Sequence, residues 1–98
     1  MAQKEEKIMT LNPDKNKTGV NIDKDKYDII KQAIRQVFKE RKEISYSTLT
    51  NIIKARLANN FTGSIRWYVE IVKLDMEARK MIERIPDTKP QMYRYKGK

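Results

Sequence analysis

The stretch that decides the fold runs from Ser64 to Tyr95 and reads SIRWYVEIVKLDMEARKMIERIPDTKPQMYRY. Apolar residues recur at helical spacing from Ile65 onward, so the first half predicts an amphipathic helix capped by Ser64. Met81–Ile85 and Gln91–Tyr95 alternate in polarity and flank a proline-bounded turn, a pattern that predicts a β-hairpin. The C-terminal third of the chain is therefore a helix that runs directly into a basic hairpin.

A first helix precedes this stretch. Asp23 can cap it, and Ile22 and Tyr27 occupy the two positions of a hydrophobic staple. From Tyr27 to Phe38, apolar residues recur every three or four positions and predict one continuous stripe. The charged run Glu40–Glu43 ends the element.

A short strand and a second helix fill the middle of the chain. Ile44-Ser45-Tyr46 alternates like a strand, and Ser47 can cap the helix that follows. Asn59-Asn60 suits the left-handed turn that closes a helix. The elements together predict an α+β fold, mostly helical, with three helices, a short strand and a C-terminal β-hairpin.

The N-terminal residues predict a different kind of segment. Residues 1–21 are dominated by Lys, Glu, Asn, Asp and Thr, and Pro13 and Gly19 interrupt any periodicity. We expect a flexible N-terminal arm over residues 1–21 and a folded domain over residues 22–96. The alternative is that the apolar residues of the arm pack on the domain; a loose tail is favoured because termini are seldom tied down.

Composition sets bounds on function. The 98 residues include 22 basic and 13 acidic side chains, and the net charge of +9 favours a polyanionic partner. There is no Cys, no His and only three Gly, so the usual metal ligands, catalytic bases and phosphate-binding glycine loops are missing. We expect no enzymatic activity, no metal, no cofactor and no small-molecule ligand. Without cysteines, a signal-peptide core or an apolar run of membrane-spanning length, a cytoplasmic protein is expected.

The order helix, short strand, helix, helix, strand, strand resembles the winged helix-turn-helix fold. Leu74–Arg84 is similar to the passage from recognition helix to wing in many bacterial regulators of this class. In those proteins a glycine commonly stands where Lys80 stands here, and glycine takes the left-handed conformation at a helix end more readily than lysine does. The resemblance implies a domain that presents a helix and a hairpin, the wing, to nucleic acid.

The chain also resembles a family of short bacterial proteins without an assigned function. This resemblance covers about residues 12 to 95 and rests on Asn12-Pro13, Asn21-Ile22-Asp23, Lys26-Tyr27, Gly63-Ser64-Ile65-Arg66-Trp67-Tyr68-Val69, Val72-Lys73-Leu74-Asp75 and Glu77-Ala78-Arg79. It is informative about the fold and carries no activity, so function has to be argued from the site.

Basic residues gather in the second helix and the hairpin. The second helix has two basic residues and no acid, and residues 86–98 have four basic residues against Asp87. In a winged helix these segments and the start of the third helix would share one face, which would contact the phosphates of duplex DNA. The predicted contact residues are Lys54, Arg56, Ser64, Arg66, Lys89, Arg94 and Lys96. Alternatively, Tyr93 and Tyr95 pack the hairpin on the core and the lysines are merely solvated.

The third helix points to a different function. Its polar strip, Arg66-Glu70-Lys73-Glu77, alternates in charge at helical spacing and predicts a solvated salt-bridge ladder, because a base-reading helix carries few acids. A second apolar line contains Trp67, Ile71 and Leu74. These three residues belong either to the core or to an interface with a second copy or another protein. The alternative function is therefore a protein-interaction or dimerisation module that binds no nucleic acid.

Overall fold

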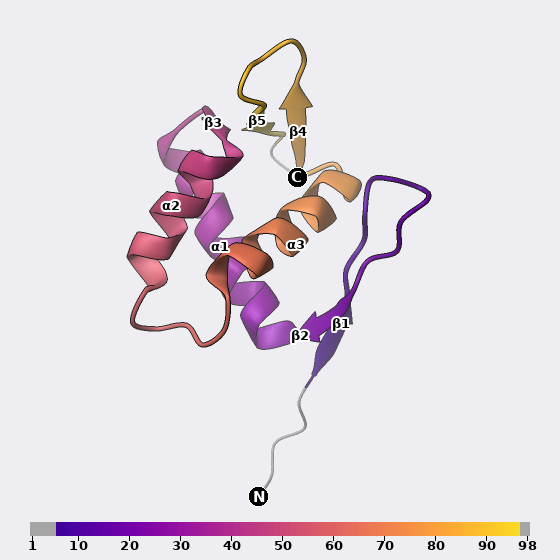
Figure 1. Ribbon diagram of the computed structural model, residues 1–98, viewed down its shortest axis with the longest axis vertical. Coiled ribbons are helices and arrows are strands. Elements are labelled where there is room, and N and C mark those ends of the chain that lie inside the picture. The colour runs from indigo at the N-terminus through magenta and orange to yellow at the C-terminus, as the bar shows by residue number, and fades with distance from the viewer. Residues whose placement is uncertain (1–5, 97–98) are drawn as a thin grey trace, which may run out of the picture.

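The structure is a computed structural model that describes residues 6–96. Its helices and strands, in chain order, are β1 (Lys7–Met9), β2 (Asn21–Asp23), α1 (Lys24–Glu40), β3 (Glu43–Ser45), α2 (Tyr46–Leu57), α3 (Ile65–Ala78), β4 (Ile82–Ile85) and β5 (Met92–Tyr95). The helices form the middle of the molecule, with a small sheet at either end (Figure 1). Within residues 6–96, none of the helices combines the length and the apolar character that a membrane crossing requires.

The C-terminal sheet, which we call the wing sheet, has three antiparallel strands in the order β3-β5-β4. The central strand pairs with β4 in the register Glu83↔Arg94 and with β3 in the register Ile44↔Tyr93. The predicted class, α+β and mostly helical with three helices, a short strand and a C-terminal hairpin, is confirmed. The arrangement is compatible with a winged helix.

The core lies where the three helices meet the wing sheet. The predicted apolar stripe of the first helix is buried along its whole length, and it packs against the inward sides of α2 and α3. The buried residues are Tyr27, Ile30, Ile34, Val37 and Phe38 from α1, Leu49 and Ile53 from α2, and Val69, Val72 and Met76 from α3, with Ile44, Ile82 and Tyr93 from the sheet.

Both ends of the second helix differ from the prediction. The cap is Ser45 and not Ser47, because the Ser45 Oγ accepts a hydrogen bond from the Thr48 backbone N–H at 3.3 Å. Ser45 is thus both the last residue of β3 and the N-cap of α2. The sequence has serines at positions 45 and 47, and spacing alone does not show which of them is the cap. At the other end, neither residue of Asn59-Asn60 takes a positive φ. The Asn60 N–H instead bonds to the Leu57 carbonyl at 2.9 Å in an ordinary turn.

The third helix ends in a left-handed lysine. Lys80 has a φ of 66°, and its N–H bonds to the Glu77 carbonyl at 3.1 Å. The Met81 N–H bonds to the Met76 carbonyl at 2.9 Å, which completes the pair of bonds of a Schellman motif. The helix therefore stops where a glycine would stop it, although lysine tolerates this conformation less well.

The N-terminal segment differs from the expected flexible arm. β1 and β2 pair in the register Lys7↔Asp23, and this N-terminal hairpin packs on α1 (Figure 1). Residues 1–5 of the predicted arm lie outside the described residues, and the boundary between arm and domain stays a prediction.

Close contacts across the N-terminal hairpin fix its shape. The buried Thr10 donates from Oγ1 to the Val20 carbonyl at 3.0 Å and accepts from the Val20 N–H at 2.9 Å. Gly19 passes so close that a Cβ there would lie 1.8 Å from the Thr10 carbonyl oxygen, so this position requires glycine.

A buried carboxylate on α3 fastens the N-terminal hairpin to the helices. Asp75 is fully buried and accepts hydrogen bonds from the Leu11 backbone N–H at 2.8 Å, from the Tyr27 hydroxyl, and from Arg79 Nε at 2.9 Å. Burial of Tyr27 and its bond to Asp75 raise the pKa of this tyrosine above its ordinary value. The partner that orders the segment before α1 lies far along the chain, which explains why the local sequence suggested a loose arm.

We expect Lys80→Gly to stabilise the protein. Glycine avoids the steric cost of the left-handed conformation, about 1 kcal/mol or more, and part of this gain is offset by its greater freedom in the unfolded chain. The free energy of unfolding, measured by urea denaturation, should rise by up to about 1 kcal/mol. Gln32→Gly, at an exposed position in the middle of α1, is the control and should lower it by about 1 kcal/mol. A loss of stability in Lys80→Gly would contradict the prediction.

Alkaline pH should weaken the bond between Tyr27 and Asp75. The folded-state pKa of Tyr27 lies above the unfolded value of about 10, so the bond contributes fully below pH 10 and is lost as the pH rises through the folded pKa. We expect Tyr27→Phe to lower the free energy of unfolding by about 1–2 kcal/mol at pH 7. Above pH 10, its stability should fall less steeply than that of the wild type.

Urea denaturation at a series of pH values between 7 and 11 checks this expectation. Tyr68→Phe removes a hydroxyl that bonds to no described residue, so it should follow the wild type throughout. Parallel curves for the wild type and Tyr27→Phe above pH 10 would show that Tyr27 does not link folding to pH.

Candidate nucleic-acid interface

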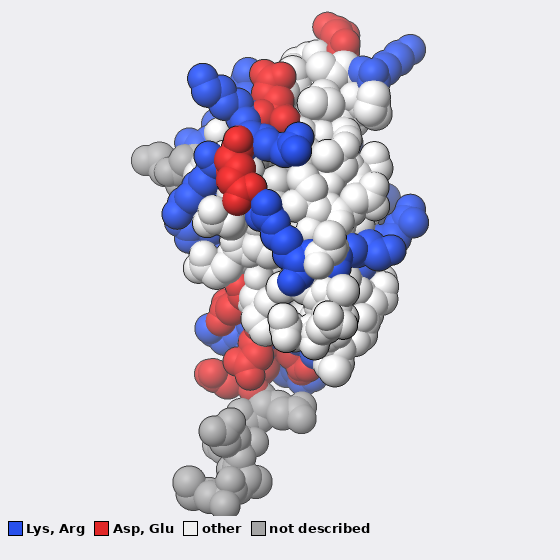
Figure 2. All heavy atoms as spheres, turned by 90° about the vertical axis from the view of Figure 1, so that its left-hand side faces the viewer, with Lys and Arg blue, Asp and Glu red and all other residues white. Residues whose placement is uncertain are grey.

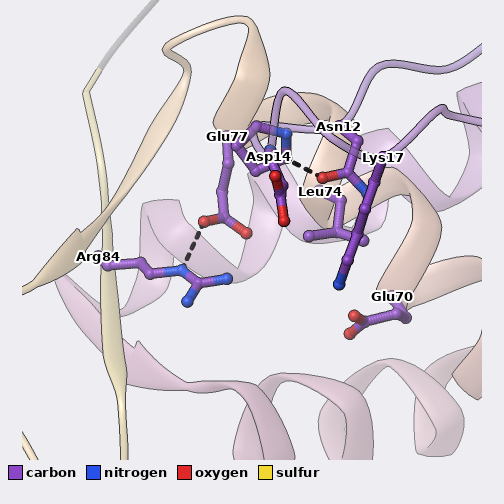
Figure 3. Close-up of a pocket in the computed structure, with 8 residues that line it drawn as sticks. Asn12, Asp14, Lys17, Glu70, Leu74, Glu77 and Arg84 are labelled. Carbon is purple, nitrogen blue, oxygen red and sulfur yellow. Dashed lines mark hydrogen bonds and ion pairs between the residues drawn. The ribbon is translucent and has the colours of Figure 1, made fainter.

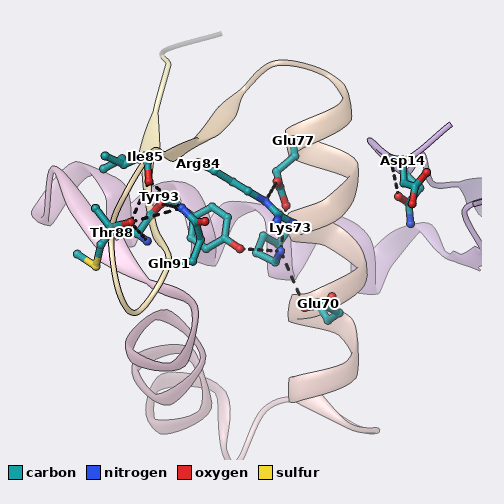
Figure 4. Close-up of polar contacts among 11 residues, drawn as sticks. Asp14, Glu70, Lys73, Glu77, Arg84, Ile85, Thr88, Gln91 and Tyr93 are labelled. Atoms are coloured by element: carbon teal, nitrogen blue, oxygen red, sulfur yellow. Dashed lines mark hydrogen bonds and ion pairs between the residues drawn. The ribbon is translucent and has the colours of Figure 1, made fainter.

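The wing sheet covers the C-terminal part of the polar strip of α3. Lys73 is only 3% exposed, and its Nζ lies 2.9 Å from Glu77, 4.0 Å from Glu70 and 4.8 Å from the centre of the Tyr93 ring (Figure 4). Arg84, on β4, donates from Nε to Glu77 at 2.8 Å. The predicted ladder is present in part: Lys73 pairs with Glu70 and Glu77, whereas Arg66 forms no ion pair within residues 6–96. The predicted solvated position was wrong for Lys73 and Glu77, because the hairpin folds over this part of the helix. Lys73 and Glu77 are therefore not available to contact a nucleic acid on this side of α3.

A cleft of about 530 Å³ lies between the N-terminal hairpin and α3 (Figure 3). It is lined by Asn12, Pro13, Asp14, Lys17, Glu70, Leu74, Glu77 and Arg84. Figure 3 shows the Lys17 side chain pointing towards Glu70, and Arg84 is bonded to Glu77. Each cation of the cleft thus faces a carboxylate of the same lining. We interpret the cleft as a charge-balanced junction between hairpin and helix, which gives a polyanion little to bind.

Arg94 of the wing forms an ion pair with Glu83 of the same hairpin. Arg94 lies opposite Glu83 in the sheet, and Arg94 Nε donates to this carboxylate while Lys96 Nζ lies 3.4 Å from it. The bond from Arg94 lowers the pKa of Glu83 below its ordinary value, because the guanidinium stabilises the charged carboxylate. Lys89, in the hairpin turn, is exposed and forms no ion pair with a described residue.

The tyrosines of the wing pack inward. Tyr93 is buried above Lys73, and the Tyr95 ring lies 6.1 Å from that of Phe38. Gln91 closes the turn by donating from Nε2 to the Ile85 carbonyl at 2.9 Å (Figure 4). The packing alternative for these two tyrosines is therefore confirmed.

Three of the predicted contact residues meet where α2 faces the start of α3. Three adjoining grooves of about 430, 100 and 400 Å³ lie here, and Arg66 lines all of them. Lys54 lines two of the grooves, and so does Ser64, whose Oγ also caps α3 by accepting from the Trp67 N–H at 3.1 Å. We call this region the Arg66 surface and define it by Tyr46, Asn51, Lys54, Ser64, Arg66 and Trp67.

Positive charge on the Arg66 surface is weakly compensated. Neither α2 nor the first turn of α3 contains an acid, and Glu70 is the one carboxylate among the lining residues of the three grooves. Within residues 6–96, no carboxylate forms an ion pair with Lys54 or Arg66. The start of α3 adds the partial positive charge of a helix N-terminus.

The view onto the α2 side of the molecule supports this description. In Figure 2, most of the surface around the basic side chains in the middle of the face is uncharged, with one acidic group beside them, whereas those towards the top and bottom lie among acidic ones. The uncompensated charge is thus local.

The predicted contact residues do not form one continuous basic face. Arg56 turns to α1, where it lies 2.5 Å from Glu40. In Figure 1 the hairpin turn with Lys89 is at the top of the molecule, well above the start of α3. Lys54, Ser64 and Arg66 are brought together, and the wing residues lie apart from them. The reason is that the wing hairpin follows the C-terminal end of α3, whereas Ser64 and Arg66 lie at its start, and Arg56 pairs with Glu40 of α1.

Trp67 does not belong to the core. It is 45% exposed, and its ring stands edge-on to that of Tyr68 with 4.9 Å between the centroids. Ile71 and Leu74, on the same line of α3, are partly buried, and Leu74 lies in the cleft against the N-terminal hairpin. The core interpretation was wrong for Trp67, because the hairpin reaches only the second half of this line.

Sequence reasoning missed the polar side of α2. The Tyr46 hydroxyl donates to the Arg66 carbonyl at 3.4 Å, and Asn51 lines the smallest groove. Thr50 lines the same groove, and its Oγ1 is buried without a hydrogen-bond partner among the described residues. The signal was present, since Tyr46, Thr50 and Lys54 are spaced by four and share one helix face.

A family model described as a family of unknown function (DUF6958) matches residues 7–93, which run from the first residue of β1 into β5. The chain belongs to this family. The resemblance to proteins without an assigned function is thereby confirmed, while the family description names neither a winged helix nor a ligand. Searches of curated proteins and of solved structures found no significant match.

We expect Lys73→Met to lower the free energy of unfolding by about 3 kcal/mol. The substitution leaves Glu77 buried with one of its two partners removed, and breaking a buried ion pair from one side is costly. Adding Glu77→Gln removes the unpaired charge and should restore part of this loss. Urea denaturation of the single and double variants measures both effects, with Lys42→Met, at an exposed position, as the neutral control. Strictly additive losses would contradict a coupled pair.

Proposed function

We propose that this DUF6958 protein binds nucleic acid through the Arg66 surface, by contacts from its cations to the phosphate backbone. One observation carries the proposal: Lys54 and Arg66 line adjoining grooves, and neither is paired with a carboxylate among the described residues. A cation that is already paired must give up its partner to bind phosphate, and these two need not. The net charge of +9 adds long-range attraction.

The start of α3 supplies further donors for a phosphate. Backbone N–H groups in the first turn of a helix have no partner within the helix and point towards the solvent beyond its end. Ser64 uses its Oγ as an acceptor for the Trp67 N–H, so its hydroxyl hydrogen can still be donated. Lys54 and Arg66 flank these donors in one groove, a combination suited to a phosphate group.

The wing contributes less in this proposal. A phosphate would have to compete with Glu83 for Arg94 and Lys96, which both lie beside that carboxylate. Lys89 remains the accessible cation of the hairpin. Duplex DNA that reached both the Arg66 surface and the hairpin would therefore gain a contact at Lys89 and little from the other two residues.

A protein-interaction or dimerisation module is the alternative, and the exposed Trp67 favours it. The open apolar area is small, however, because Ile71 and Leu74 on the same line are partly covered. A stable interface takes about 800 Å² from each partner, and a single aromatic side chain supplies at most about 250 Å². We therefore place nucleic-acid binding first.

We expect Lys54→Ala/Arg66→Ala to weaken binding on the order of tenfold at low salt. Plotted as log affinity against log salt concentration, the slope should become shallower by about 1.4 to 1.8, since each lost phosphate contact removes about 0.7 for a single strand and about 0.9 for a duplex. Fluorescence anisotropy of labelled random duplex and single-stranded DNA at several salt concentrations measures both quantities.

Lys15→Ala/Lys39→Ala is the matched control. It removes two exposed lysines outside the Arg66 surface and changes the net charge by the same amount. Equal losses in the two double variants would mean that only the total charge matters and that the Arg66 surface is not the site. Wild-type protein that bound neither DNA at low salt would remove the proposal altogether.

A further inference from the structure

The indole of Trp67 is presented as an open aromatic surface. It is 45% exposed at the start of α3, and the edge-on contact with Tyr68 holds one side of it against the fold. Tyr68 is itself edge-on to Phe61, with 5.2 Å between the ring centroids, and the Lys26 ammonium lies 5.4 Å from the centre of the Tyr68 ring. The Trp67 ring is therefore backed by packed aromatic residues, while a large part of it meets solvent.

One cation lies beside this aromatic surface, and a second lines the adjoining grooves. Trp67 and Arg66 line the same groove of about 430 Å³, and Arg66 also lines the two grooves that contain Lys54. An exposed aromatic ring beside uncompensated cations is the combination that binds single-stranded nucleic acid, because the ring stacks on a base while the cations contact the flanking phosphates.

We propose that Trp67 stacks on an unpaired base, so that the ligand class of the Arg66 surface is a single-stranded segment of nucleic acid. This inference rests on the proposed function and adds the strandedness of the ligand. In a duplex the faces of the bases are stacked on one another and only their edges are open, so a protruding indole finds no surface to stack on unless the duplex opens.

The rest of the fold favours the single strand. A duplex reader uses a helix whose polar side is free to enter the major groove, and here Lys73 and Glu77 on that side are buried under the wing sheet. What remains open is the start of α3, where an aromatic ring, two cations and the unpartnered Thr50 hydroxyl lie around one set of grooves. Glu70, the one acid there, can accept from the amino group of a base.

The intrinsic fluorescence of the protein tests the inference directly, because Trp67 is its single tryptophan. A short oligo-dT and an oligomer of abasic nucleotides with the same length have the same phosphates and differ only in the bases. We expect oligo-dT to quench the Trp67 emission and to bind about 5- to 150-fold more tightly than the abasic oligomer. Parallel titrations with oligo-dU and oligo-U, which differ only in the sugar, show whether the sugar matters, and quenching by any of these strands supports stacking.

Two variants separate stacking from structure. Trp67→Phe keeps an aromatic face and should retain most of the preference for oligo-dT over the abasic oligomer, measured by anisotropy of labelled strands. Trp67→Ala should lose that preference while its affinity for the abasic oligomer stays unchanged. Circular dichroism checks that both variants remain folded, which is expected for an exposed side chain.

The remaining outcomes distinguish a failure of the stacking proposal from a failure of the proposed phosphate binding. Equal affinity for oligo-dT and the abasic oligomer without quenching, or tighter binding to duplex DNA, would overturn stacking and leave the proposed phosphate binding intact. Absence of binding to every strand would overturn both. Sedimentation of a dimer that Trp67→Ala dissociates would place Trp67 in an interface between copies and would overturn the inference.

Discussion

Three ionisable side chains are buried on the second half of α3, and the rest of the structure depends on how they are paired. Burying a charge costs several kcal/mol unless a partner with good geometry compensates it. Asp75 finds its partners in α1 and the N-terminal hairpin, and Lys73 and Glu77 find theirs along α3 and in β4. α3 is therefore the element to which the N-terminal hairpin, α1 and the wing sheet are all attached.

This use of α3 for assembly limits where it can act. The side of the helix that a base reader would keep free is taken up by the ion pairs of Lys73, so the open part is its first turn, with Arg66 and Trp67. The same turn has an acid-free neighbour in α2, and the Tyr46 hydroxyl joins the two elements by bonding to the Arg66 carbonyl. The residues of the proposed site thus lie in the first turn of this helix of 14 residues, and the buried ionisable residues lie in its second half.

Local patterns in the sequence were sufficient to predict the features that depend on residues close by in the chain. The apolar stripe of α1 and the hairpin that follows α3 come from spacing alone, and both are present in the structure. What depends on distant partners was missed: Asp75 orders the segment around Leu11, and the wing buries Lys73. Periodicity marks which residues share a helix face but not what covers that face, so a ladder of alternating charges reads as solvated when its cover lies elsewhere in the chain. The same limit applies to Trp67, whose exposure follows from how far the N-terminal hairpin reaches.

Net charge alone did not show where the proposed binding surface lies, because several basic residues are paired with carboxylates that are distant in the chain. A chain of 98 residues has few elements with which to build an interface, and many of its basic residues also stabilise the fold through pairs such as Arg56 with Glu40. A paired cation contributes little field at the surface, since the neighbouring carboxylate cancels it within a few ångströms. We therefore place the proposed binding surface among the cations that have no ion-pair partner within the described residues. Here Lys54 and Arg66 meet that condition and line the same grooves. The exposed indole of Trp67 lies beside Arg66, so the proposed surface offers an aromatic ring as well as positive charge.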